Sequence, residues 1–134
     1  MAIAVLDSYA LLAFFRGEEA ALQVKELLQK AASTDRPLHM TEINYAEVKH
    51  MLAKKDGGDG WKQAAEILSS LPIEFHPAGR QLADLAADFK ARHKISLADA
   101  FAAALAKERK AELVTGDSEF KALEKEIKIN WLLK

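Results

Sequence analysis

The chain has 134 residues, of which 50% are hydrophobic and 29% charged, a composition typical of one soluble globular domain. Its 19 lysines and arginines nearly balance its 20 aspartates and glutamates, and the net charge of -1 excludes a strongly basic nucleic-acid clamp and a disordered polyion. The absence of cysteine excludes disulfides, thiol nucleophiles and cysteine-ligated metal centres. We therefore expect a single domain over residues 1–134.

No segment resembles a targeting or membrane signal. The N-terminal residues Met1–Asp7 lack the basic start and long apolar stretch of a secretory signal. The apolar run Tyr9–Phe15 is far shorter than the roughly 20 helical residues that cross a bilayer. We expect a cytoplasmic protein that does not contact a membrane.

Short apolar runs alternate with amphipathic patterns along the chain. The predicted elements of the first half are, in order, a strand at Ile3–Leu6, helices at Ser8–Phe15 and Glu18–Ala32, a strand at Pro37–Met40, a helix from Thr41 to about Lys55, and a turn at Asp56–Gly60. Those of the second half are a helix at Trp61–Leu71, a strand at Ile73–His76, a helix around Leu82–Phe89, a helix at Ser96–Lys110, a strand at Glu112–Thr115, a helical turn or two at Asp117–Lys125, and a strand at Ile127–Leu132. This alternation predicts an α/β fold, with helices on both faces of a parallel sheet.

Three aspartates stand at predicted strand ends or helix starts. Asp7 follows the first strand and Asp117 follows the fourth, so a parallel sheet brings both to the edge where such folds bind ligands. Asp99 is the only polar residue between Leu97 and Ala106, which predicts a helix buried nearly all round. Each aspartate could equally be a helix cap or a first-turn acid.

Glu47 is a fourth candidate, in the middle of the helix that begins at Thr41. It lies four residues from both Ile43 and Met51, which places it at the border of the buried face. A glutamate in mid-helix is more often a solvated surface residue. Only its combination with the three aspartates marks it as functional.

The four acids together predict a divalent cation. Two carboxylates about 5 Å apart repel by roughly 3 kcal/mol at an effective dielectric constant of about 20, so a cluster requires protonation or a cation. Oxygen donors without cysteine suit Mg²⁺ or Mn²⁺. Mg²⁺ often completes its coordination with substrate phosphate oxygens, which favours a phosphodiester substrate.

At these acids the sequence resembles the PIN-domain ribonucleases, and among them the small stand-alone VapC-type toxins. The resemblance rests on four segments that follow the family's order, namely Val5–Ser8, Thr41–Glu47, Leu97–Ala106 and Val114–Phe120. Each segment is short, but the set is specific and covers nearly the whole chain. The resemblance implies a single PIN-like domain with a five-stranded parallel sheet, and a Mg²⁺- or Mn²⁺-dependent endoribonuclease.

The resemblance also implies roles for individual residues. The catalytic, metal-binding quartet would be Asp7, Glu47, Asp99 and Asp117. Ser8 and Thr115 match hydroxyl positions that support the quartet, while Gly116 stands where relatives often have asparagine. Toxins of this type usually form homodimers and are silenced by an antitoxin protein.

An RNA substrate calls for positive charge near the acids. We expect phosphate contacts from Arg16, Lys49, Lys54, Arg92 and Lys94. The four histidines show no metal-spaced pair such as H-x-x-x-H, and His76, between Phe75 and Pro77, is expected to be a structural or surface residue.

Three other functions fit parts of the pattern. A flavodoxin-like receiver domain would use Asp7 as a phosphoryl acceptor, although Asp7 lacks a preceding acidic partner. A haloacid-dehalogenase phosphatase requires a second aspartate at the position of Tyr9. An inactive PIN-like interaction module has no need for four intact acids.

Overall fold

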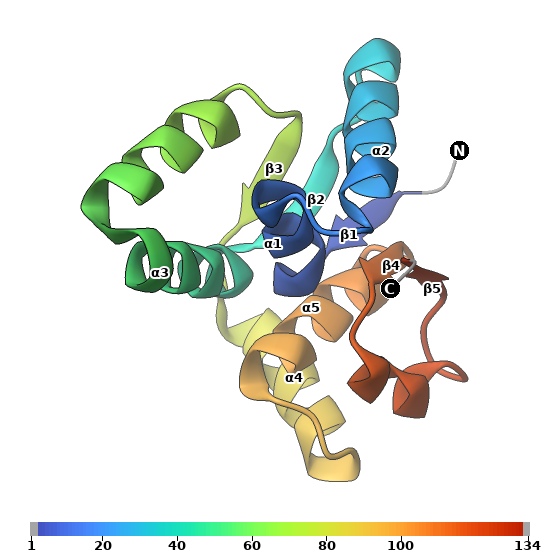
Figure 1. Ribbon diagram of the computed structural model, residues 1–134. Coiled ribbons are helices and arrows are strands. Elements are labelled where there is room, and N and C mark those ends of the chain that lie inside the picture. Colours follow the sequence, from blue (N-terminus) through green and yellow to red (C-terminus); the bar gives the residue numbers. More distant parts are fainter. Residues whose placement is uncertain (1–2, 133–134) are drawn as a thin grey trace.

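The predicted strands pair into one parallel sheet in the computed structural model, which describes residues 3–132 (Figure 1). The strands are β1 (Ala4–Leu6), β2 (Leu38–Thr41), β3 (Ile73–His76), β4 (Glu112–Thr115) and β5 (Ile129–Trp131). The helices are α1 (Ser8–Arg16), α2 (Ala21–Thr34), α3 (Glu42–Ser69), α4 (Arg80–Arg92), α5 (Leu97–Glu108) and the short 3₁₀ helix η1 (Ser118–Leu123). The five-stranded α/β architecture is confirmed. The first and last two residues of the predicted domain lie outside the described part.

Helices cover both faces of the sheet because side chains alternate along each strand. Leu6 packs with residues of α1 and α2, whereas its neighbour Val5 packs with residues of α4 and α5. α5 is mostly alanine on its buried surface, so its backbone approaches the sheet closely while α4 packs against it from outside. This arrangement buries α5 nearly all round, as its sequence predicted.

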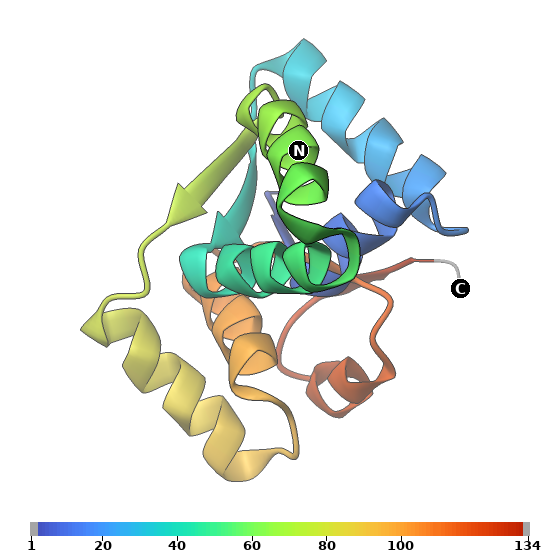
Figure 2. The ribbon, with the colours of Figure 1, turned by 60° about the vertical axis from the view of Figure 1, so that its left-hand side comes forward.

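The glycine-rich segment between two predicted helices is a sharp bend. α3 continues through Asp56–Gly60, but Gly57 has φ 74° and ψ -172°, and the helix changes direction there (Figures 1 and 2). A Cβ at Gly57 would meet no atom within 4 Å, so glycine is favoured by the positive φ and not by lack of space. The predicted turn is therefore a kink at Gly57 that separates two helical segments of α3.

The strand order determines where a ligand can bind. The order is β3-β2-β1-β4-β5 with all pairs parallel, so the connections reverse direction between β1 and β4. Ligand sites in open parallel sheets lie beyond the carboxyl ends of the strands at this kind of switch point. The order also differs from the 2-1-3-4-5 arrangement of flavodoxin-like domains, which rules out the receiver-domain alternative.

Among residues 3–132, no helix combines the length and apolar character needed to cross a membrane.

Candidate active site

Asp7 lies at the switch point, at the carboxyl end of β1, with only 1% of its surface exposed. One carboxylate oxygen caps α1 by accepting the Ala10 N–H at 2.9 Å, and the other accepts the Thr115 hydroxyl at 2.5 Å. Burial first, and then the charges of Asp117 and Glu47, raise the pKa of Asp7 to about 7, although these two hydrogen bonds act to lower it. The capping role and a place in an acidic site are therefore compatible.

Asp117 extends the same site from the carboxyl end of β4. Its backbone N–H donates to the Thr115 hydroxyl oxygen at 3.0 Å, so Thr115 connects Asp117 to Asp7. Its carboxylate caps η1 by accepting the Glu119 N–H at 2.9 Å. Thr115 is fully buried, so its hydroxyl holds the Asp7 carboxylate against the backbone of Asp117.

Asp99 reaches the site from the first turn of α5. Its N–H donates to the Ser96 hydroxyl oxygen at 3.1 Å, so Ser96 caps α5 and Asp99 is an acid of the first turn, one of the two roles that its position allowed. Burial raises the pKa of Asp99 to about 8, and a hydrogen bond with Glu119 and the charges of Asp117 and Asp7 act in the same direction. The Asp99 side chain thus faces the other acids, although its backbone belongs to the capped first turn of α5.

Glu119 is an acid that sequence reasoning did not select. One oxygen from each of Asp99, Asp117 and Glu119 lies within 4.8 Å of the others, a separation that a cation could bridge. Glu47 is half-buried on α3, and its charge raises the pKa of Asp7, so it lies near the site but outside this group of three carboxylates. Glu119 occupies a 3₁₀ helix, whose facing direction a 3.6-residue period does not predict.

The donor set fits a hard divalent cation. Its donors are carboxylate oxygens, and two of the acids, Asp7 and Asp99, have a pKa raised by burial and, to a lesser extent, by repulsion from neighbouring carboxylates. A bound cation would relieve that repulsion, and oxygen ligands are those that Mg²⁺ and Mn²⁺ prefer. The arrangement can therefore hold a metal ion against a phosphate group.

Asn44 joins the segments that carry the acids, a role for which no sequence pattern provided a signal. Its side-chain N–H₂ donates to the Ser8 hydroxyl oxygen at 3.0 Å and to the Ala98 carbonyl oxygen at 3.2 Å, and its oxygen accepts the Thr41 hydroxyl at 2.5 Å. Ser8 follows Asp7 in the chain, and Ala98 precedes Asp99. One fully buried amide therefore links the first turns of α1, α3 and α5.

We expect Asn44→Ala to lower the free energy of unfolding by about 2–3 kcal/mol, because it leaves buried polar partners without hydrogen bonds. RNA cleavage is expected to fall as well, since Ser8 and Ala98 lose their common partner. Urea unfolding and cleavage assays measure the two effects, and Asn130→Ala, which removes a half-buried amide bonded to Glu112, is the matched control. Equal effects from both substitutions would contradict this role.

Gly116 explains a departure from the family pattern. A Cβ at this position would lie 2.3 Å from a ring carbon of Tyr9, so the tyrosine ring occupies the space of the missing side chain. Tyr9 also stands where a haloacid-dehalogenase phosphatase requires its second aspartate, and it packs against the core cluster of α1 and α2. Tyr9 therefore does not supply the second acid that such a phosphatase needs.

The basic residues predicted to meet RNA differ in their surroundings. Lys49, Lys54 and Lys94 are exposed, and Lys49 stacks on the ring of Trp61. Arg92 is paired with a carboxylate oxygen of Glu126 at 2.6 Å. Arg16 is half-buried, and its Nε lacks a hydrogen-bond partner among the described residues.

Comparison with known proteins places this site in a family. A family model for the PIN domain matches residues 4–126. No curated protein sequence matches the chain.

Solved structures show the same fold. A chain of VapBC2 from Rickettsia felis, bound to a DNA fragment from its promoter, has 16% identity and a TM-score of 0.77, with 98% of this chain and 99% of that chain covered. VapBC-1 from nontypeable Haemophilus influenzae has 18% identity and a TM-score of 0.72, with 96% and 97% covered. The sarcin-ricin loop cleaving toxin VapC20 from Mycobacterium tuberculosis has 19% identity and a TM-score of 0.71, with 89% and 93% covered. At these identities the likeness is one of fold.

Proposed function

This chain belongs to the PIN domain family, and from that premise we propose that it is a Mg²⁺-dependent endoribonuclease and the toxin of a toxin–antitoxin pair. The observation that carries the proposal is the convergence of buried Asp7 and Asp99 with Asp117 at the switch point of the sheet. Clustered carboxylates repel one another, and an interaction module without activity would gain nothing from that repulsion. We propose further that residues 1–134 form one PIN-like domain.

We assign the metal to Asp7, Asp99 and Asp117, with Glu47 as a further ligand or as the group that orients the attacking water. A bound Mg²⁺, or Mn²⁺ in its place, lowers the pKa of water and stabilises charge on the scissile phosphate. Thr115 holds Asp7 and Asp117 in register, and Ser8 holds the Asp7 segment against α3 through Asn44. Glu119 adds a carboxylate beside Asp99, on the η1 side of the site.

The test of this function is cleavage of a mixed RNA substrate by tagless protein. We expect cleavage with Mg²⁺ or Mn²⁺, none with excess EDTA, and recovery when Mg²⁺ is restored. Cleavage that persists in EDTA would contradict the proposed mechanism. Absence of cleavage under all conditions would favour the inactive-module alternative.

The proposed antitoxin partner follows from the similarity to structures of toxin–antitoxin systems. We propose that an antitoxin protein binds this chain and blocks cleavage, and that the chain forms a homodimer. Co-expression with the product of an adjacent reading frame tests the first point, and light scattering of the purified protein tests the second.

RNA affinity is expected to fall steeply with salt, because exposed lysines replace counterions on the phosphates. For about four neutralised phosphates the dissociation constant should rise about 50-fold between about 50 and 200 mM salt. Fluorescence anisotropy measures this on a variant that cannot cleave. Lys94→Gln should reduce the slope, whereas Lys25→Gln on exposed α2 serves as the control and should not. Affinity that is flat over this range would refute the assigned contacts.

A further inference from the structure

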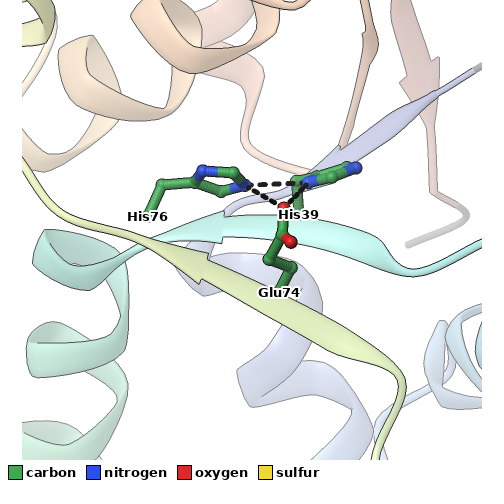
Figure 3. A group of neighbouring side chains, drawn as sticks. All are labelled: His39, Glu74 and His76. Carbon is green, nitrogen blue, oxygen red and sulfur yellow. Dashed lines mark hydrogen bonds and ion pairs between the residues drawn. The ribbon is translucent and has the colours of Figure 1, made fainter.

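Two histidines and a glutamate form a second cluster of metal-ligand side chains, on β2 and β3 (Figure 3). His39 lies opposite Glu74 in the parallel pairing, and His76 follows two residues after Glu74 on the same side of β3. Since Leu38 and Met40 pack with the cores beneath α1, α2 and α3, His39 faces the α5 side of the sheet. Strand pairing, and not spacing along a helix, brings the two imidazoles together.

The three side chains direct one atom each toward a common point, as Figure 3 shows. His39 Nδ1 and His76 Nε2 are 2.8 Å apart, and one Glu74 oxygen lies 3.3 Å from the first and 3.1 Å from the second. Ligand atoms around a tetrahedral zinc ion with bonds of about 2.0–2.1 Å stand about 3.3 Å apart. Shifts of about 0.5 Å would therefore fit these atoms to such an ion.

We propose that His39, Glu74 and His76 form a binding site for a divalent transition-metal ion of the Zn²⁺ class, separate from the acidic site. Two imidazoles and one carboxylate are a donor set that suits Zn²⁺ better than Mg²⁺. His39 is buried and His76 half-buried, whereas Glu74 is exposed, so an ion can enter from the solvent side. Three protein ligands leave a position for water.

Arg109, which follows α5, sets the tautomer of His76. Its Nη2 lies 3.4 Å from His76 Nδ1, so Nδ1 accepts this hydrogen bond and Nε2 carries the proton. Metal binding at Nε2 requires this proton to move to Nδ1 and the long contact with Arg109 to open. Burial and the charge of Arg109 lower the pKa of His76, whereas the carboxylates of Glu74 and Glu108 raise it. Negative as well as positive charge therefore surrounds this imidazole.

Such an ion would link the edge strand β3 to its neighbour β2. Within residues 3–132, β3 is the outermost strand on this side of the sheet, and its one pairing partner is β2. A metal bound across His39 and His76 joins the two strands through side chains as well as the backbone ladder. Zn²⁺ is therefore expected to raise the thermal stability of the protein, independently of RNA cleavage.

The experiment titrates tagless protein with Zn²⁺, monitored by calorimetry and by the imidazole ¹⁵N signals. Zn²⁺ should shift the ring signals of His39 and His76 and leave those of exposed His50 in place. We expect His76→Ala and Glu74→Gln each to weaken binding, the former by at least about 100-fold. His50→Ala is the matched control and should bind as the wild type does.

The acidic site is tested separately with Asp99→Asn. If this variant keeps the Zn²⁺ site, the proposal stands whether or not the protein cleaves RNA. Unshifted His39 and His76 signals in the folded wild-type protein would overturn it. Loss of Zn²⁺ binding in Asp99→Asn but not in His76→Ala would assign the ion to the carboxylates and would also overturn it.

Discussion

Asp99→Asn is expected to reduce metal-dependent RNA cleavage by at least about 100-fold, with little change in folding. The substitution keeps the size of the side chain, and the cap survives because the backbone N–H of residue 99 donates to Ser96. It removes a carboxylate that faces Asp117 and Glu119, so the proposed metal loses a ligand. Initial cleavage rates at saturating Mg²⁺ measure the loss.

The matched control is Asp88→Asn on the exposed surface of α4, which should cleave at the wild-type rate. Circular dichroism and thermal unfolding check that both variants fold. Equal rates for Asp99→Asn and the wild-type protein would mean that the observed cleavage does not arise at this site.

The stability of the metal-free protein is expected to fall as pH rises from about 6.5 to about 8, by about 1–2 kcal/mol. In the folded state Asp7 has a pKa of about 7 and Asp99 of about 8, whereas unfolded aspartate titrates near 3.8. Over this range the folded state binds more protons than the unfolded state, so deprotonation destabilises the fold. Above about pH 9, where the folded state has lost both protons, the curve should level off.

Two other groups titrate in the opposite sense, at lower pH. Burial and the charge of Arg109 lower the pKa of His39 and His76, so the unfolded state binds more protons at these residues. Their contribution to stability therefore rises with pH up to about 6.5, against the fall that the two aspartates cause over the same range. The aspartate effect is therefore measured above that value.

Urea unfolding in EDTA gives the pH profile, and repetition in Mg²⁺ gives the control. Mg²⁺ should restore stability at pH 8, because it binds the ionised carboxylates. Asp99→Asn should flatten the metal-free profile, since it carries a neutral amide where the wild type must lose a proton. A wild-type profile that is flat or rises between pH 6.5 and 8 would contradict the assigned surroundings of the two aspartates.

Much of the fold could be predicted because its strands are short apolar runs with clear ends. Ile73–His76 lies between two prolines, and Glu112–Thr115 ends at Gly116; both strands are confirmed with the predicted bounds. The second strand is shifted by one residue at each end because Thr41 both completes β2 and caps α3. Local patterns cannot separate these two roles.

The candidate site was predictable where it depends on strand order. Asp7 and Asp117 follow β1 and β4, which are neighbours in the sheet, and parallel pairing brings their side chains to the same edge. Asn44 could not be selected, because its partners lie 36 and 54 residues away and its own position resembles any polar residue in a first turn. The contact between His39 and His76 could not be predicted for the same reason, because the two residues are 37 positions apart in the chain.

The most direct measurement is Mn²⁺ binding followed by electron paramagnetic resonance, because carboxylate sites suit this ion and free and bound Mn²⁺ give different signals. Wild-type protein is predicted to bind Mn²⁺, with affinity lowered at least about tenfold by Asp7→Asn, Asp99→Asn or Asp117→Asn and unchanged by Asp88→Asn. Unaltered Mn²⁺ affinity in folded protein carrying all three substitutions would contradict the convergence of these aspartates on one ion.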